Sequence, residues 1–391
     1  MDAGISHGFG LGRVSAVMAV GVFALMIAGI QPVVLGALQI AGRITVSQIG
    51  VAATFELLAL GLMSAIAESI FSVRYLRSIG ITAGICLTAL NLLSAFLVGW
   101  EFIVIRAAAG LAAGILLWIT AGLISRSRAP ERAAAIFLTT QTLAQLGGAA
   151  LLPIIGVDSK PDLGLWFLAA MALLATLSCL GIPRAYAPLG RTSEGRGRAS
   201  LSLASFVTLV LVVAQVAFVL GIWVYMDPLV RLSGLSPTIG AFAVAVGLGA
   251  QVVGGLVAMV VPAKVTPRAV FLAAGLIDLV LLVIFAGHPG APIFFVTVFV
   301  FGFLWLFVMP YQTLMAVKVD PSRRTAMLVP FAQLLGASVG PFVASMVVKE
   351  DDMYRVLLLG GGWVGVWFVG LLLLHIARRR PLGAKGNGGV I

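Results

Sequence analysis

Charged side chains are scarce in this 391-residue sequence: Asp, Glu, Lys and Arg make up 10% of it, against 61% hydrophobic residues. A soluble domain has about 25% charged and about 45–50% apolar residues. So few charges cannot cover a surface that faces water, whereas a surface that faces lipid needs almost none. The composition therefore excludes an ordinary soluble protein and predicts a polytopic α-helical integral membrane protein.

Cysteine and histidine are also rare. The two cysteines, Cys86 and Cys179, lie far apart within apolar runs, and the three histidines, His7, His288 and His375, lie near the ends of such runs. The sequence contains no HExxH, CxxC or GxxxxGK[ST] pattern. These are the spacings of zinc, redox and nucleotide-phosphate sites, so we expect no metal, no cofactor and no nucleotide-driven chemistry.

The apolar runs are long. One bilayer crossing requires about 20 apolar residues as a helix, and the chain holds twelve such runs. The first follows Arg13 without a convincing small-residue cleavage site, so we expect it to be retained as a span. The expected spans are 14–38, 48–71, 79–99, 102–124, 134–155, 164–182, 205–229, 236–261, 269–286, 292–317, 325–347 and 354–376.

A polar stretch rich in Arg, Gly and Ser divides the chain near its middle. We therefore expect four parts: a six-helix bundle at 1–182, a cytoplasmic linker at 183–203, a second six-helix bundle at 204–378 and a cytoplasmic tail at 379–391. With the N-terminus inside, 19 of the 25 Lys and Arg residues lie on the cytoplasmic side, five lie outside and one lies within a span. This bias predicts a cell-membrane protein with both termini in the cytoplasm. The net charge of +11 thus reflects the basic residues of cytoplasmic loops, and we expect no nucleic-acid partner.

The two halves share a weak repeat. The segment Arg132–Gly148 aligns without gaps with Arg324–Gly340 at an offset of 192 residues. Identical residues in these segments include Gln141 with Gln333 and Gly148 with Gly340, and in the span before them Gly110 matches Gly302. An offset of half the chain predicts two parallel repeats related by an axis along the membrane normal.

Three local patterns carry a resemblance to a known family. The fourth span reads Arg106-Ala-Ala-Ala-Gly110-Leu-Ala-Ala-Gly114, like an RxxxGxxxG motif, and a basic turn follows at Arg128–Arg132. The eleventh span reads Gly336-Ala-Ser-Val-Gly340-Pro341, like a GxxxGP motif. With the span count, the loop lengths and the repeat, the sequence resembles the major facilitator superfamily. The resemblance implies an all-α membrane fold with 12 transmembrane helices in two pseudo-symmetric six-helix bundles.

Other positions depart from the family pattern. The loop after the second span usually reads GxxxDRxGRR; here Glu68 stands in the acidic place and Arg74 near a basic one, following Ser64, but the glycines are absent. The GxxxGP motif of the drug/proton antiporter branch normally lies in the fifth span, not the eleventh. That branch is the nearest in motif, in degenerate form.

Ionisable residues within spans are the main functional candidates. An unpaired arginine inside a span costs about 2.5–3.5 kcal/mol, so we expect Arg106 to pair with Glu56, which lies at a comparable depth. Two interpretations stay open: a structural ion pair, or a proton or substrate site. Asp278, in the middle of the ninth span, has the same two interpretations, and Asn91 lies at a similar relative depth.

The resemblance supplies further candidates. In the family, spans one, four, seven and ten line the substrate cavity, which singles out Gln31, Trp118, Gln215, Trp223, Trp305 and Gln312. Candidates for gating or helix interfaces are Ser64, Glu68, Arg74, Gln141, Asp227, Gln333, Gly336, Gly340 and Pro341. We expect Gln141 and Gln333 to hydrogen-bond across the interface between the halves.

The sequence thus predicts a secondary active transporter rather than an enzyme. The candidate cavity residues are aromatic or amide-bearing, which favours a small, moderately hydrophobic organic solute. The expected mode is alternating access with proton-coupled efflux, by a monomer in the lipid bilayer. The alternatives are uptake or facilitated transport of a small metabolite and, in another class, a polytopic membrane enzyme or a receptor.

Overall fold

The computed structural model describes residues 10–127, 130–186, 201–260, 265–320, 323–349 and 352–379. Within these ranges the chain forms fourteen α-helices and one short 3-10 turn. Twelve segments are long and apolar enough to cross a membrane, which confirms the expected number of spans. In chain order the elements are α1 (Leu11–Ala24), α2 (Met26–Ile40), α3 (Val46–Ile70), α4 (Leu76–Ser94), α5 (Gly99–Ser125), α6 (Pro130–Ile154), α7 (Asp162–Ser178), η1 (Cys179–Gly181), α8 (Leu203–Trp223), α9 (Met226–Leu232), α10 (Pro237–Val260), α11 (Pro267–Ala286), α12 (Ala291–Val319), α13 (Arg324–Val347) and α14 (Tyr354–Arg379).

Some sequence predictions fall outside the described ranges. They are the central part of the predicted linker, 187–200, most of the predicted tail, 380–391, and residues 128–129 of the basic turn.

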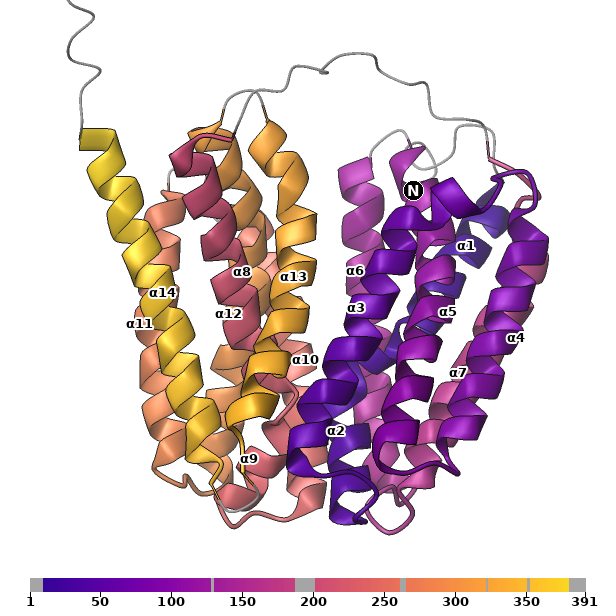
Figure 1. Ribbon diagram of the computed structural model, residues 1–391, viewed down its shortest axis with the longest axis horizontal. Helices are drawn as coiled ribbons and strands as arrows, with labels where there is room; N and C mark the ends of the chain where they lie inside the picture. The colour runs from indigo at the N-terminus through magenta and orange to yellow at the C-terminus, as the bar shows by residue number, and fades with distance from the viewer. Residues whose placement is uncertain are drawn as a thin grey trace, which may run out of the picture.

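The helices form two bundles, one from each half of the chain (Figure 1). Helices α1 to α7 build the N-terminal bundle, and α8 to α14 build the C-terminal bundle. Two helix pairs supply most of the contact between the bundles, α3 with α13 and α6 with α10. The repeat matches α3 with α10 and α6 with α13, so exchanging the halves exchanges the two pairs. This is the arrangement expected of parallel repeats.

Glycines at matching repeat positions bring the same helices together in both bundles. Gly110 of α5 lies against the backbone of Glu56 on α3, and Gly302 of α12 lies against the backbone of Gly247 on α10. A Cβ atom would lie 3.0 Å from the carbonyl carbon of Glu56 in the first case and 2.9 Å from that of Gly247 in the second. Neither position has room for a side chain, so the sequence repeat corresponds to a structural one.

Two spans are broken, although one continuous helix was expected for each. The seventh span breaks at Val224 and Tyr225, between α8 and α9. Pro228 explains this break, because proline lacks an N–H group and its ring clashes with the carbonyl four residues earlier. The first span breaks at Leu25, between α1 and α2. There the Leu25 carbonyl accepts a hydrogen bond from Nε2 of Gln145 on α6 at 2.8 Å, which stabilises the interrupted backbone.

The third span also ends earlier than expected, at Ser94 rather than residue 99. Arg43, in the loop between α2 and α3, explains the early end. Its Nη2 donates to the carbonyl of Ser94 at 3.0 Å and to the carbonyl of Leu97, and its Nη1 pairs with Asp162 of α7. These bonds satisfy carbonyls that a longer helix would have used.

The bundles are joined by side-chain hydrogen bonds at the end where α2 ends and α3 begins, which we call the closed end. The donor and acceptor pairs are Arg231 with the Gln39 side chain, Thr238 with Asp158 at 2.7 Å, and Ser47 with the Ser345 carbonyl at 2.7 Å. Deeper in the membrane, Thr54 Oγ1 donates to the Ser338 carbonyl at 3.1 Å. At the opposite end, where α7 ends and α8 begins, no side-chain hydrogen bond between described residues joins the bundles. We call this the linker end, and the bundles stand apart there (Figure 1).

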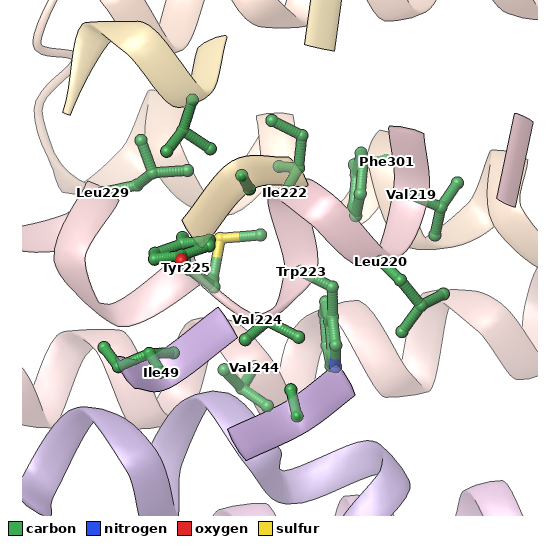
Figure 2. Close-up of a cluster of buried hydrophobic side chains, with 14 of the residues drawn as sticks. Ile49, Val219, Leu220, Ile222, Trp223, Val224, Tyr225, Leu229, Val244 and Phe301 are labelled. Atoms are coloured by element: carbon green, nitrogen blue, oxygen red, sulfur yellow. The ribbon is translucent and has the colours of Figure 1, made fainter. Parts of the chain in front are cut away.

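An apolar layer seals the closed end. Figure 2 shows Trp223, Val224 and Tyr225 around the break in the seventh span, with Ile49 of the N-terminal bundle in the same cluster. All four side chains are completely buried. The break therefore turns large side chains of the C-terminal bundle toward the N-terminal one.

Candidate functional site

Glu56 of α3 and Arg106 of α5 form an ion pair inside the N-terminal bundle. Arg106 Nε donates to Glu56 Oε2 at 3.2 Å, and Arg106 Nη2 donates to Glu56 Oε1. The remaining Nη1 donates to Oδ1 of Asn91 on α4 at 2.6 Å. A two-atom fork is the strongest arrangement between arginine and a carboxylate. The expected pair is present, and Asn91 completes it.

Helix packing positions this cluster. Gly110 lies one turn after Arg106 and contacts the backbone of Glu56 itself, so α5 approaches α3 closely enough for the guanidinium to reach the carboxylate. Asn91 is held in turn by its Nδ2, which donates to the Leu168 carbonyl of α7 at 3.4 Å. Glu56 is 2% exposed and Arg106 is 1% exposed, so the pair is removed from solvent.

A small cavity adjoins the ion pair. It is lined by Phe23, Ala24, Ile27, Glu56, Leu87, Asn91, Arg106, Ala113 and Leu168. The volume of this cavity that the centre of a water-sized sphere can occupy is about 10 Å³. By the same measure, a single water needs about 10–15 Å³. Gln31 of α2 approaches the Glu56 carboxylate, but neither of its amide atoms makes a well-aligned hydrogen bond to a described residue. The cavity beside the cluster can thus hold about one water, but it has no room for an organic solute.

The C-terminal bundle holds a chain of glutamines instead. Gln312 of α12 donates from Nε2 to Oε1 of Gln215 on α8, and Gln333 of α13 donates from Nε2 to Oε1 of Gln312 at 2.6 Å. Gln312 is fully buried. The structure therefore brings together two of the cavity candidates with one of the interface candidates.

Gln141 and Gln333 do not form the inter-bundle bonds expected from the sequence. Gln333 bonds within its own bundle, and Oε1 of Gln141 is buried with no hydrogen-bond partner among the described residues. The repeat places the two residues on equivalent helices, α6 and α13. Only Gln333, on α13, faces an amide on a neighbouring helix, that of Gln312 on α12. Gln145, one turn beyond Gln141, makes the bond to Leu25 described above.

The tryptophan candidates occupy two separate places. Trp223 and Trp305 contact each other edge to face in the C-terminal bundle, with ring centroids 5.5 Å apart. Trp118 lies in the N-terminal bundle beside Phe71, with ring centroids 6.3 Å apart. Both Trp118 and Trp223 are buried, and Nε1 of Trp223 has no partner among the described residues. A buried donor without a partner is uncommon in folded proteins, and a polar ligand or a water that reached this nitrogen would satisfy it.

The two aspartates of the C-terminal bundle differ in setting. Asp278 of α11 is 3% exposed and makes no hydrogen bond or ion pair to a described residue. Asp227 of α9 lies at the closed end and pairs with Arg231, one turn later, at 3.1 Å. Asp227 also packs against Gly36 of α2, so it reaches the N-terminal bundle. Asp227 is thus placed at the contact between the bundles, whereas Asp278 lies on a helix outside it.

The candidates near the linker end of α3 make no contact with the ion pair. The hydroxyl of Ser64 donates to the Gly61 carbonyl within α3. The Glu68 carboxylate lies 4.0 Å from Nη2 of Arg126 at the end of α5. Arg74 lies in a surface groove between α4 and the segment after α7. These contacts lie within the N-terminal bundle.

The GxxxGP pattern of α13 packs against α8. A Cβ atom at Gly336 would lie 2.6 Å from the Val213 carbonyl oxygen, and one at Gly340 would lie 2.7 Å from the Ala217 Cα. The glycines thus permit close helix approach, the role for which small residues are favoured in membranes. The carbonyl of Pro341 faces Gly50 of α3, at the contact between the bundles.

Several polar residues of the site escaped the sequence reasoning. They are Gln145, which supports the break in the first span, and residues that join the bundles. Of these, Gln39, Asp158, Arg231 and Thr238 lie at the closed end, and Thr54 lies deeper in the membrane. A signal existed for Gln145, because Gln141 and Gln145 are four residues apart and share one helix face.

Comparisons with known proteins extend these observations. No protein-family model and no curated protein matches the sequence. Solved structures do match. A variant of the nucleoside transporter NupG has a TM-score of 0.74 at 11% identity, over 93% of this chain and 99% of that one. The D-xylose–proton symporter has a TM-score of 0.69 at 13% identity, over 96% and 98%.

A bacterial homologue of the human lysosomal transporter Spinster, in an inward-facing and occupied conformation, has a TM-score of 0.66 at 16% identity, over 94% of this chain and 96% of that one. Sequence identities this low support a shared architecture and nothing more. With its twelve spans in two pseudo-symmetric bundles, the chain has the major facilitator fold.

Proposed function

We propose that this protein is a secondary active transporter that moves a small, moderately hydrophobic organic solute by alternating access. The supporting observation is that hydrogen bonds between described residues join the two bundles at the closed end and in the middle of the membrane, but not at the linker end. Two bundles related by symmetry and bonded in this way can rock about α3–α13 and α6–α10. Such rocking is the movement by which transporters of this architecture work.

The proposed substrate site lies between the bundles near the glutamine chain and the Trp223–Trp305 pair. Amide groups and an unpaired indole N–H would orient a neutral polar group, and the aromatic rings would cover an apolar body. The structural neighbours include a nucleoside transporter and a pentose symporter, so nucleosides and pentoses belong in a first substrate panel beside hydrophobic drug-like solutes.

We further propose that Glu56 couples transport to protons, with efflux as the direction and uptake as the alternative. Burial disfavours a charged carboxylate, while a paired arginine favours it. If the conformational change of transport also moves α5 against α3 and separates Arg106 from Glu56, the carboxylate takes up a proton in one state and releases it in the other. The water-sized cavity beside the pair supplies space for that exchange.

The test is flux into and out of proteoliposomes under an imposed pH gradient. Glu56→Gln should abolish proton-coupled flux while leaving substrate exchange or binding partly intact, because the amide cannot titrate. Glu101→Gln is the matched control, because Glu101 is an exposed glutamate in the first turn of α5. Unchanged pH dependence in Glu56→Gln would remove the proton role. The absence of flux for every solute in the wild type would favour an enzyme or receptor instead.

The proposed orientation places the closed end outside and both termini in the cytoplasm of the cell. A cysteine at Lys160, exposed in the loop between α6 and α7, should react with an impermeant thiol reagent added to intact cells. A cysteine at Arg132, exposed at the start of α6, should react only after the cells are opened. The reverse pattern would invert the topology.

A further inference from the structure

A groove at the linker end is lined by three arginines from two separate segments. Arg74, Arg77 and Arg184 surround it together with Tyr75, Ser78, Ile81 and Thr82. Its volume is about 390 Å³, within the range of about 300–1,000 Å³ that is typical of small-molecule sites. It lies between the start of α4 and the segment that follows α7, far from the contact between the bundles.

No acidic side chain among the described residues neutralises the charge of the groove. None of the three arginines makes an ion pair with a described residue, and Glu68, the acid nearest in sequence, faces Arg126 instead. Three guanidinium groups around one concave surface produce a strong attraction for an anion. Arginine is also the side chain best suited to phosphate, because its planar fork binds two oxygens at once.

The backbone around the groove is held in place. The amide of Leu76 donates to the Arg184 carbonyl at 3.0 Å, and Nη2 of Arg77 donates to the Ile182 carbonyl at 2.8 Å. Tyr186 donates its amide to the Val73 carbonyl at 3.1 Å. These bonds tie the segment after α7 to the start of α4. The backbone positions of the three arginines are therefore fixed relative to one another.

The groove opens onto a surface suited to lipid chains. From Thr82 an exposed face continues along α4 at helical spacing through Ile85, Ala89 and Leu92, and the exposed Phe96 follows in the turn after the helix. Tyr75, at the mouth, is 66% exposed, and tyrosine is enriched where a span leaves the membrane. A phosphate in the groove would therefore carry its acyl chains down an apolar helix face.

We infer that this groove binds the headgroup of an anionic phospholipid, with the phosphate among Arg74, Arg77 and Arg184 and the acyl chains along α4. Basic pockets between spans at a membrane surface bind such headgroups in other proteins. A soluble phosphate would use the arginines but not the apolar face, so the two sources of the anion make different predictions. The site is separate from the proposed substrate site, so either proposal can fail without the other.

The test measures lipid retained by the purified full-length protein, by native mass spectrometry after exchange into mixed micelles. Wild-type protein should retain phosphatidylglycerol in preference to phosphatidylcholine. Arg74→Gln with Arg184→Gln should weaken phosphatidylglycerol binding about 25-fold, about fivefold for each arginine, because one basic side chain near an anionic surface contributes about 1 kcal/mol. Neither side chain makes a hydrogen bond to a described residue, so the variant should fold.

The matched control is Arg13→Gln with Arg132→Gln, which removes the same charge from exposed positions at the same end of the same bundle. It should bind lipid like the wild type. A second variant, Thr82→Trp, fills the groove without changing charge and should also lose the lipid. Equal retention by the groove variants and the control would overturn the inference, as would equal binding of phosphatidylcholine. Displacement of the lipid by excess inorganic phosphate would show that the groove is a site for soluble anions.

Discussion

The N-terminal bundle holds an ion pair in its core, whereas the C-terminal bundle holds a chain of neutral glutamines. The helix contacts around these cores are equivalent, since Gly110 and Gly302 serve the same packing role. Gly110 meets Glu56, however, whereas Gly302 meets Gly247, and at the offset of 192 Arg106 corresponds to Val298. The two halves have therefore kept a common scaffold while their polar chemistry has diverged.

This difference suggests a division of labour. A charged pair in a closed core suits a titrating function, and linked amides suit the orientation of a neutral solute. The contact residues between helices tolerate little change, because a Cβ at either glycine would meet backbone. Substitutions in the two cores, at their shared glycines and at the contact between the bundles would show how unequal the halves are.

The largest effect is expected from Arg106→Leu. The substitution leaves the Glu56 carboxylate buried without its partner, and breaking a buried pair costs about 3–5 kcal/mol. Thermal unfolding in detergent should show this loss. The double variant Glu56→Leu with Arg106→Leu should recover much of it, because two apolar side chains leave no charge behind. A double variant as unstable as Arg106→Leu would show that the cluster stabilises the bundle through more than its charges.

Alanine at the paired glycines tests the shared scaffold. Gly110→Ala and Gly302→Ala should each destabilise the protein by about 1–3 kcal/mol, because the added methyl group overpacks a backbone contact. Gly147→Ala, which has open space around it on α6, should not destabilise it. Unequal losses at Gly110 and Gly302, measured by unfolding under the same conditions, would break the symmetry of the two helix pairs.

The glutamine chain should contribute less than the ion pair. Gln312→Leu removes both hydrogen bonds of the chain and should cost about 0.6–2 kcal/mol, the range for hydrogen bonds between helices in membranes. Because amides do not titrate, the loss should be the same at acidic and neutral pH. Gln251→Leu is the control, since Nε2 of Gln251 is buried without a partner among the described residues. A pH-dependent loss in Gln312→Leu would link the chain to a titrating group.

The smallest effect is expected where the halves touch. Thr238→Val removes one exposed hydrogen bond, from Thr238 of the C-terminal bundle to Asp158 of the N-terminal bundle. The closed end should lose about 0.5 kcal/mol of stability relative to the open form. Distances between spin labels placed on the two bundles should show a roughly twofold shift in populations. An unchanged distribution of spin-label distances would show that the apolar layer around Trp223 and Tyr225 alone holds the closed end together.

The sequence predicted the architecture more completely than the site. The pairing of Glu56 with Arg106 was expected from depth alone, because neither charge is tolerable by itself within a span. The third partner, Asn91, was matched by depth to Asp278, which lies in the other bundle. Gln333 was expected to reach across the interface, yet its amide bonds to Gln312. The depth of a residue along its span could be estimated from the sequence, but the residue that faces it on the neighbouring helix could not.

The sequence by itself determined the number of spans, the division into halves and the repeat. These depend on local properties, namely the length of apolar runs relative to the bilayer and the spacing of identical residues along the chain. Only the tertiary structure decided which polar groups meet, where the first span breaks, and which end of the bundles is closed. A buried polar group takes its partner from whichever helix faces it at the same depth, and that neighbour is set by the packing of all the spans together.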